Sequence, residues 1–320
     1  GETLVIVPNQ YTLVAEEQAL KYLNTSCLLN VEILSMNRLG LRMLQEQGTD
    51  NVRMLDRYER YMLLARIIRN REKQLDIFRT AAGKRNFVDM VHDFIADFRQ
   101  QECTREELEE ILADPETDEL LRKKIRELSG ILEEYESLVQ GKYKDVEDYV
   151  DLYTDAIGKS RELAGKTVWV YGFDSMTAKF VRSLTEIAGV ARNVYVMVNR
   201  TDFGLEDVLI RSIRRSAEEK GLTVSVETLT GDVLEKSETL KRIEQGLFTQ
   251  SDKTKIASAD FRPADLQVVE CANLYNEAEN AAIQVYNLLH RGYRMKDIVI
   301  ICNDTEKMQP IVERTFREYG

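Results

Sequence analysis

Two short polar stretches, each directly after an apolar run, carry the side chains best suited to binding. In VPNQYT (7–12), Gln10 and Thr12 offer hydrogen-bond donors and acceptors. In SMNRLGL (35–41), Arg38 offers a planar guanidinium that suits a phosphate or the edge of a guanine base. A plainer interpretation has Thr12 capping a helix, Arg38 covering apolar surface or capping, and Gln10 sitting in solvent. Spacing alone favours the plainer interpretation.

A nucleotide-hydrolysing site would need a glycine-rich phosphate loop and paired carboxylates for Mg²⁺ on a later strand. The sequence has no G-x-x-x-x-G-K-[ST] pattern. AGKT (164–167) has the right residue types, but Lys166 precedes a predicted strand instead of opening a helix, so we predict a turn there. In VWVYGFDSMT, Tyr171 and Gly172 stand where the carboxylate pair is needed, and Asp174 comes too late.

The tip of the same stretch carries two apolar side chains, Phe173 and Met176. They fit either core packing or stacking on a base, and the sequence leaves both interpretations open. Carboxylate pairs such as Glu106 and Glu107 fall within predicted helices, where charge runs are typical of solvated faces. We therefore assign no catalytic residue.

The spacing of cysteine and histidine residues gives little support for a metal site or a reactive thiol. None of the four cysteines is in a C-x-x-C pair, and neither His92 nor His290 has a second ligand at metal-binding spacing. We predict reduced thiols in a cytoplasmic protein, with no zinc site and no histidine-based catalytic triad. The chain also lacks a signal segment and any apolar run approaching the roughly 20 residues that span a bilayer, so we predict no membrane association.

Charge is unevenly distributed along the 320 residues. The net charge of −11 argues against a generic DNA-coating protein. Residues 102–155 contain 18 acidic and 7 basic residues, whereas the balance reverses between residues 38 and 73. A local basic surface can bind phosphates even in an acidic protein. The basic residues of the second segment are Arg38, Arg42, Arg53, Arg57, Arg60, Arg66, Arg69, Arg71 and Lys73.

The elements that position these residues follow from periodicity. Residues 3–7 and 31–35 are predicted strands, and the sequence from about 43 to 163 is helical almost throughout. Alternating strands and helices then resume, which predicts an α/β fold with a parallel sheet split by a helical insertion. Residues 249–263 are predicted to be a linker. The later predicted strands are GKTVWVYGFDSMT, RNVYVMVNRT, TVSVETLTG, LQVVECA and KDIVIICND.

Five stretches in order resemble the N-terminal part of the AddB (RexB) family, one of the two subunits of the bacterial AddAB helicase–nuclease. The final block also resembles the opening of the second motor domain in UvrD-type superfamily 1 helicases. The resemblance extends nearly end to end in motif order. The stretches are VPNQYTLVAEEQAL, VEILSMNRLGLRML, VWVYGFDSMT, NLYNEAENAAIQVYNLLHRGYRMKDIVII and FREYG.

The resemblance implies two RecA-like domains of the P-loop NTPase type. The first comprises residues 1–42 and 164–250, split by a helical insertion subdomain at 43–163, and residues 264–320 begin the second. In the family, the P-loop precedes the position of Gly1 and an iron–sulphur-bound nuclease domain lies far downstream. The chain is therefore expected to be a piece of a longer protein. ATP, Mg²⁺ and the cluster would belong to the full-length complex, with no cofactor in this piece.

The resemblance also implies a role in DNA repair by homologous recombination. An AddA-type subunit is the motor, while the AddB helicase-like region guides single-stranded DNA and scans it for the Chi regulatory sequence. Whether this chain has any enzymatic activity of its own is left open. The DNA-contacting positions implied by the family are Gln10, Thr12, Met36, Arg38, Leu41, Phe173 and Met176.

Several positions depart from the family pattern. Met36 and Leu41 stand where members often have aromatic residues, which bears on base stacking. Tyr171 replaces an aspartate, and Asn303 lies near the place of an arginine of active helicases, both consistent with a motor that does not hydrolyse ATP. Two alternatives stay open: a piece of an active UvrD-like ATP-dependent helicase, and a structural scaffold for the AddA-type subunit.

Overall fold

The computed structural model describes residues 2–48, 54–140, 143–199, 205–229, 236–246 and 265–320. These residues form two compact units, 1–229 and 230–320, which are described separately. The predicted linker at 249–263 lies outside the described residues. No helix within these ranges is long and apolar enough to cross a bilayer.

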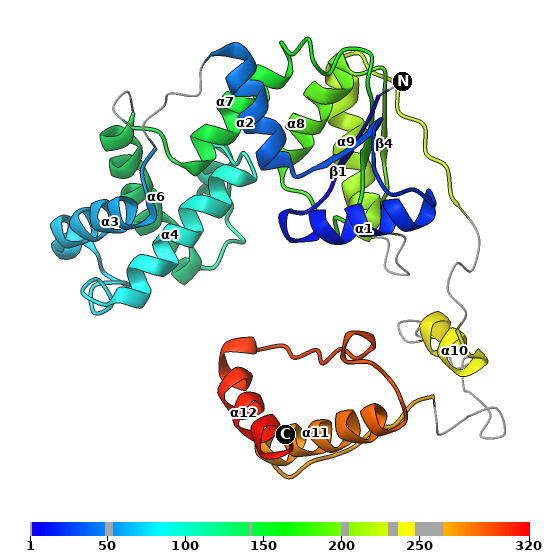
Figure 1. Ribbon diagram of the computed structural model, residues 1–320. Helices are drawn as coiled ribbons and strands as arrows, with labels where there is room; N and C mark the ends of the chain where they lie inside the picture. The colour runs from blue at the N-terminus through cyan, green and yellow to red at the C-terminus, as the bar shows by residue number, and fades with distance from the viewer. Residues whose placement is uncertain (1, 49–53, 141–142, 200–204, 230–235, 247–264) are drawn as a thin grey trace. The chain divides into compact units, whose positions relative to one another are not determined.

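The first unit is built on a four-stranded parallel sheet (Figure 1). Its strands are β1 (Thr3–Ile6), β2 (Val31–Leu34), β3 (Thr167–Val170) and β4 (Asn193–Val196), in the spatial order β2-β1-β3-β4. Ile6 of β1 pairs in register with the last residue of β2 on one side and of β3 on the other. This confirms the predicted α/β class and the first four strands, in a RecA-like arrangement with a helical insertion.

Helices cover one face of the sheet and part of the other. α2 (Met36–Gln47), α7 (Val146–Ile157) and α8 (Ala178–Val190) bury alternate strand residues such as Leu4 and Val168 in a common core, and α9 (Leu205–Glu219) packs on α8. α1 (Thr12–Tyr22) lies on the opposite face, over Val7 and Ile33. The connection from β1 to β2 runs in one direction across the sheet, and those from β2 to β3 and from β3 to β4 run in the other. Because such connections are right-handed as a rule, their helices lie on opposite faces.

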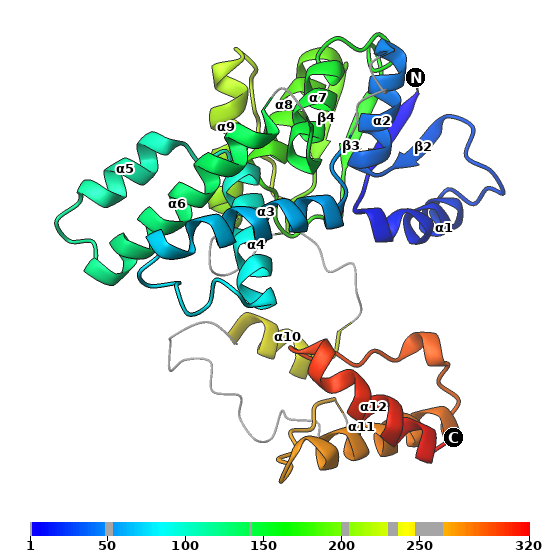
Figure 2. The same cartoon turned by 90° about the vertical axis from the view of Figure 1, so that its left-hand side faces the viewer.

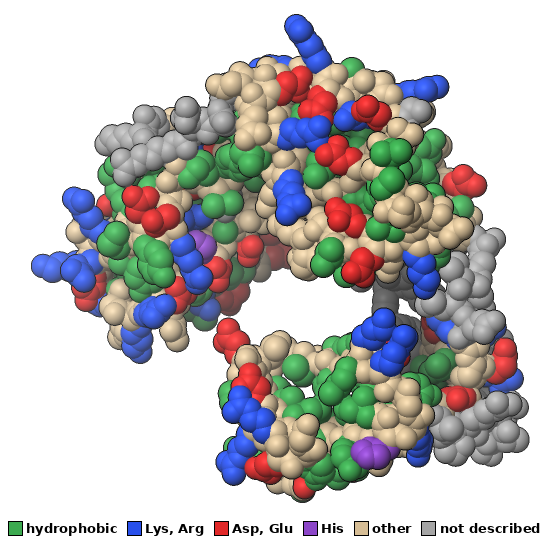
Figure 3. All heavy atoms as spheres, in the orientation of Figure 1, with side chains coloured by type: hydrophobic (Ala, Val, Ile, Leu, Met, Phe, Trp, Pro, Cys, Tyr) green, Lys and Arg blue, Asp and Glu red, His purple; other side chains and the backbone are tan. Residues whose placement is uncertain are grey.

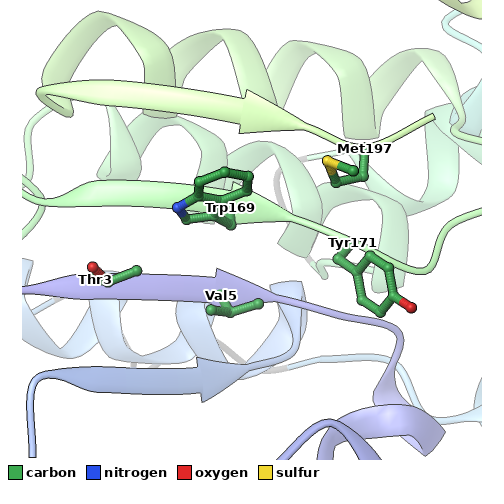
Figure 4. Close-up of a pocket in the computed structure, with 5 residues that line it drawn as sticks. All are labelled: Thr3, Val5, Trp169, Tyr171 and Met197. Carbon is green, nitrogen blue, oxygen red and sulfur yellow. The ribbon is translucent and has the colours of Figure 1, made fainter. Parts of the chain in front are cut away.

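The second face is only half covered. Trp169 of β3 and Tyr195 of β4 stack with ring centroids 4.4 Å apart, yet Trp169 is 37% and Tyr195 46% exposed. Figure 4 shows Trp169 and Tyr171 on the same side of the sheet, beside Met197. A hollow of about 390 Å³ lies here, lined by Thr3, Val5, Trp169, Tyr171 and Met197. We call Trp169, Tyr171, Tyr195 and Met197 the open sheet face.

Within the predicted insertion, the helices before α7 lie together (Figure 2) and have a core of their own, whereas α7 packs in the core of the sheet. The helices before α7 are α3 (Arg57–Arg71), α4 (Arg85–Gln100), α5 (Arg105–Ala113) and α6 (Glu119–Val139), with a short 3₁₀ helix, η2, at Glu72–Gln74. Apolar residues spaced three and four apart bury one stripe of each main helix, as their periodicity predicts. The fully buried members include Leu64, Ile67, Ile68, Val91, Ile95, Ile131 and Tyr135.

Charged side chains attach the insertion to α7 and α8. Arg99 at the end of α4 pairs with Asp145 and Asp148, which form the capping box at the start of α7. The Tyr135 hydroxyl of α6 donates to Asp145 Oδ2 at 3.1 Å. Beside them, Arg182 of α8 pairs with Glu102 after α4 at 2.8 Å. The junction therefore joins α4, the residue Glu102 after it, and α6 to α7 and α8.

The structure confirms three predictions that depend only on residues close together in the sequence. Gly48 ends α2 in the left-handed conformation at φ 67°. Thr104 and Glu107 form the predicted capping box of α5. The AGKT stretch is a turn: Gly165 has φ 80°, and Lys166 Nζ lies 3.2 Å from a carboxylate oxygen of Glu162.

The second unit contains α10 (Glu238–Gly246), α11 (Leu274–His290), a 3₁₀ helix η5 (Met295–Asp297) and α12 (Thr305–Glu318), with α11 packed on α12. The strands predicted in 266–272 and 296–304 are wrong for this structure, because neither stretch is assigned as strand. Val268 and Ile301 are 89% and 87% exposed. A β-strand needs a hydrogen-bonded neighbour, and the described residues supply none there. Residues 223–229 likewise are not a strand.

Candidate functional site

Three segments leave the sheet at the same edge. Because all strands are parallel and β1 lies between β2 and β3, residues 7–12, 35–41 and 171–177 begin side by side at the carboxyl ends of their strands. In open parallel sheets, ligands bind beyond this edge. The two polar stretches that the sequence singled out are therefore neighbours, as their strand assignments predict. We call these three segments the carboxyl edge.

The first segment presents Gln10 to solvent. After Pro8, the 3₁₀ helix η1 (Asn9–Tyr11) leads into α1, and Gln10 is exposed with no side-chain hydrogen bond among the described residues. Thr12 is the first residue of α1, and its hydroxyl donates to the Asn9 carbonyl at 3.3 Å. The plainer interpretation of Thr12 as a helix cap is therefore wrong.

The second segment presents Arg38. The Ser35 hydroxyl caps α2 by accepting the Arg38 backbone N–H at 3.4 Å, so the Arg38 side chain is not used for capping. That side chain is exposed, and the described residues give its guanidinium no hydrogen bond or ion pair. Leu41 is 44% exposed nearby, whereas Met36 is only 5% exposed and belongs to the core.

Arg42 shows how an arginine one turn further along is neutralised. Its guanidinium lies 2.6 Å from a carboxylate oxygen of Glu32 and 2.5 Å from one of Glu162. Burial would lower the pKa of Arg42, but the two carboxylates outweigh that effect and raise it. Arg38 has no such partners among the described residues, so its charge is available to a ligand.

The helix ends at the carboxyl edge add positive potential. The first turns of α1, α2 and α8 contain no acidic residue, as is also true of α4 away from this edge, whereas those of α3, α5 and α6 contain at least one. A helix N-terminus carries about half a positive charge, which an acidic first turn offsets. The exposed Asp174 is the carboxylate of the third segment. Arg38 and the positive ends of these helices together favour the binding of an anion near Arg38.

The third segment explains Tyr11, a residue to which the sequence alone assigns no role. The Tyr11 ring centroid lies 6.1 Å from that of Tyr171, and its hydroxyl donates to Gln18 Oε1 at 2.9 Å. The backbone of Gly172 is left-handed at φ 83°, and a Cβ there would lie 3.4 Å from Pro8 Cδ. Tyr11 therefore packs the exits of β1 and β3 together, a contact that no local sequence signal encodes.

Gly172 also bears on nucleotide chemistry. A side chain at φ 83° is strained by about 1–2 kcal/mol, so a carboxylate is disfavoured at this position. The neighbouring Tyr171 is a phenol whose pKa is raised, first by Tyr11 and then by burial. Position 171 therefore holds a neutral group where a metal-binding site would need an anion. Among the described residues, no group of three histidine, cysteine, aspartate or glutamate side chains could hold a metal ion.

Phe173 and Met176 lie at the base of the third segment. Both are half-buried and packed against the sheet core, and Phe173 contacts Phe180 with centroids 4.7 Å apart. Of the seven positions considered for ligand contact, the three segments expose Gln10, Arg38 and Leu41 at this edge, and Thr12 is half-buried there. They leave Phe173 and Met176 half-buried and Met36 buried.

The basic residues of 38–73 do not form one surface. Arg42 and Arg71 are paired with carboxylates, and Arg60 is buried at 4% exposure. Arg53 lies outside the described residues. Exposed cations of this set are therefore found in two places, Arg38 at the carboxyl edge and the others on α3. The latter are Arg57, Arg66 and Arg69, with Lys73 just beyond the helix.

Comparison with known proteins identifies the family. The family model described as "ADDB, N-terminal" matches residues 1–244. The chain is 26% identical over 332 residues to the B subunit of the ATP-dependent helicase/deoxyribonuclease of Alkaliphilus metalliredigens, covering 100% of this chain and 28% of that protein. It is 27% and 24% identical to the proteins of the same name from Clostridium novyi and Acetivibrio thermocellus, covering 99% of this chain and 29% of each.

These relatives are much longer than the chain, which spans 28–29% of their length. The family match nevertheless covers both segments of the sheet layer and the whole helical insertion, including the carboxyl edge. With 244 of its 320 residues matched by one family model, the chain belongs to the AddB N-terminal family.

Proposed function

We propose that this chain is the DNA-guiding, non-catalytic part of the AddB-type subunit in a bacterial AddAB-type helicase–deoxyribonuclease that processes double-strand breaks for recombination. It binds single-stranded DNA at the carboxyl edge and takes part in recognising Chi. An AddA-type subunit supplies the motor activity. ATP, Mg²⁺ and an iron–sulphur cluster are assigned to other parts of the complex. Residues 1–42 and 164–250 form the first RecA-like domain, 43–163 the inserted subdomain, and 264–320 the start of the second domain.

One observation carries the proposal: within the part of the chain that the structure describes, the exposed Arg38 guanidinium is unpaired, at an edge whose helix N-termini have acid-free first turns. A phosphate or a guanine edge is the ligand that such a fork binds through two parallel hydrogen bonds. Gln10 and Thr12 on the adjacent strand exit supply neutral hydrogen-bonding groups. The name of the relatives, a helicase/deoxyribonuclease, supports DNA as the source of that ligand.

The competing proposal is an active UvrD-like helicase. Hydrolysis would require a carboxylate pair at 171–172, and Tyr171 with the left-handed Gly172 opposes it. ATP hydrolysis by the full-length complex is therefore expected to vanish when the partner subunit alone is inactivated. Hydrolysis that survives this inactivation would favour the active-helicase alternative.

The test of the carboxyl edge uses Arg38→Ala and Gln10→Ala in the full-length complex. Loss of a charge-assisted hydrogen bond weakens binding by about 2 kcal/mol, or about thirtyfold, so Arg38→Ala should reduce both single-strand affinity and the Chi response. The matched control is Arg211→Ala, which removes another exposed cation, on α9. An Arg38→Ala complex with unchanged affinity and Chi response would refute the assignment. If single-strand affinity fell while the Chi response stayed unchanged, the role of the carboxyl edge would be limited to guiding DNA.

A further inference from the structure

α3 presents an exposed face of unusual composition. Four of its exposed residues, with one cation in the following η2, are spaced four, four, three and four apart, which places them along one side of the helix. Tyr58 and Met62 are 78% and 63% exposed, whereas residues on the opposite side, such as Leu64 and Ile67, are fully buried. We call this set the α3 stripe: Tyr58, Met62, Arg66, Arg69 and Lys73.

The positive charges of the α3 stripe are not neutralised. Among the described residues, none of the side chains of Arg66, Arg69 and Lys73 has a hydrogen bond or an ion pair. Arg66 and Arg69 are three apart and Arg69 and Lys73 four apart, so like charges face each other on adjacent turns. Glu72, three residues after Arg69, does not pair with it. In Figure 3, Lys and Arg side chains lie beside hydrophobic ones in the region of α3, with Asp and Glu side chains among them.

α9 provides an internal comparison. It also carries exposed arginines, but Arg211 follows Asp207 by four residues and Arg215 precedes Glu219 by four, with a nitrogen–oxygen distance of 3.4 Å in the second pair. Alternating charges of this kind are typical of a solvated helix face. The α3 stripe has no acidic residue among its members, although the insertion as a whole is rich in acidic residues.

We propose that the α3 stripe is a second contact surface for single-stranded DNA, separate from the carboxyl edge. Arg66 and Lys73 are about 10 Å apart along the helix axis, so the three cations can contact successive phosphates of one strand. Tyr58 and Met62 continue the same face and offer an exposed ring and thioether for an unstacked base. A duplex hides its base faces, which is why a single strand fits this combination better.

This inference rests on the proposed function only in taking single-stranded DNA as the substrate, and it assigns a different surface. The experiment measures fluorescence anisotropy of a labelled oligothymidylate of about 16 nucleotides with the full-length complex at several salt concentrations. The variant is Arg66→Gln/Arg69→Gln/Lys73→Gln, and the matched control is Arg211→Gln/Arg214→Gln/Arg215→Gln on α9. All six positions are exposed, and circular dichroism checks that both variants keep their helix content.

The α3 variant is expected to bind about tenfold more weakly, and the slope of log affinity against log salt should fall by about two, at roughly 0.7 per lost phosphate contact. The α9 variant should match the wild type. Tyr58→Ala should weaken binding with little change in slope, because it removes stacking and no charge.

Three results would overturn the proposal. One is an unchanged slope in the α3 variant, and another is an equal loss in the α9 variant, which would indicate a general charge effect. The third is normal DNA binding with loss of the partner subunit from the complex, which would assign the α3 stripe to a protein contact. Because Arg38→Ala is measured separately, a loss there with no effect at α3 would refute only this inference.

Discussion

Replacing Asp145 with alanine should lower the free energy of unfolding by about 3–5 kcal/mol, because it removes the buried carboxylate that Arg99 shares with Asp148 and that offsets the charge of the buried Arg60. Asp145 is fully buried at the start of α7 and pairs with Arg99. It also accepts the Tyr135 hydroxyl. The buried Arg60 guanidinium lies 5.6 Å from the centroid of the same tyrosine ring. Chemical denaturation of the chain followed by circular dichroism measures the loss.

The control for Asp145 is Glu133→Ala. Glu133 is 60% exposed and 3.5 Å from Arg105, a surface pair whose removal should change the free energy of unfolding by less than about 1 kcal/mol. Equal effects of the two substitutions would contradict the view that the junction between insertion and sheet layer depends on the buried carboxylate. A melting transition split in two for Asp145→Ala would show that the junction holds the two parts together.

Asp145 also predicts a pH dependence. Burial would raise the pKa of its carboxyl, but Arg99, the Asp148 backbone N–H and Arg60 outweigh burial and lower the pKa. Its stabilising contribution is therefore complete above the unfolded-chain pKa of about 3.9 and is lost as the pH falls through the lower folded-state value. Asp145→Asn should thus flatten the acid side of the stability profile below about pH 4. If the stability of Asp145→Asn below about pH 4 fell as steeply as that of the wild type, other carboxylates would dominate acid unfolding.

The second large effect is expected at Gly40 of α2. A Cβ at this position would lie 2.5 Å from Cγ of Tyr153 on α7, and Tyr153 is itself buried at 3% exposure. The tyrosine has little room to move, because its ring packs edge-on against Tyr149 at 5.7 Å. Gly40→Val should therefore destabilise the chain by about 3 kcal/mol through overpacking, measured as a lower denaturation midpoint.

A glycine with space around it is the matched comparison. A Cβ added to Gly189, in α8, would have no atom within 4 Å, so Gly189→Ala should leave stability unchanged or raise it by up to about 1 kcal/mol. Gly40→Ala should lie between the two, because better helix propensity offsets part of the clash. A stabilising Gly40→Ala would mean that α2 and α7 separate easily.

The fold was predictable wherever the signal was local. Alternating strands and helices, the glycine at 48 and the capping box at Thr104 are all recognised from residues close in sequence. The strands predicted in 266–272 and 296–304 show the limit of this reasoning. Apolar runs indicate that a segment can be a strand, but the strand itself depends on a hydrogen-bonded neighbour.

The position of the candidate site was predictable from the sequence, but which of its charged side chains lack a partner among the described residues was not. Parallel strands bring their carboxyl ends to one edge, so Gln10 and Arg38 could be placed together from sequence. Which cations stay available could not be foreseen, because Arg42 and Arg71 find their carboxylates at Glu162 and Glu134, far away in the chain. The same holds for the contact of Tyr11 with the exit of β3.

The open sheet face carries the tryptophan of this chain. Trp169 is the single tryptophan of the chain, and it is stacked on Tyr195 at that half-exposed surface. In this chain, intrinsic tryptophan emission therefore reports on the open sheet face alone. Whatever segment or partner covers the open sheet face should shift that emission toward shorter wavelengths, while DNA binding confined to α3 should leave it unchanged. The emission wavelength of Trp169 thus indicates whether the open sheet face is covered.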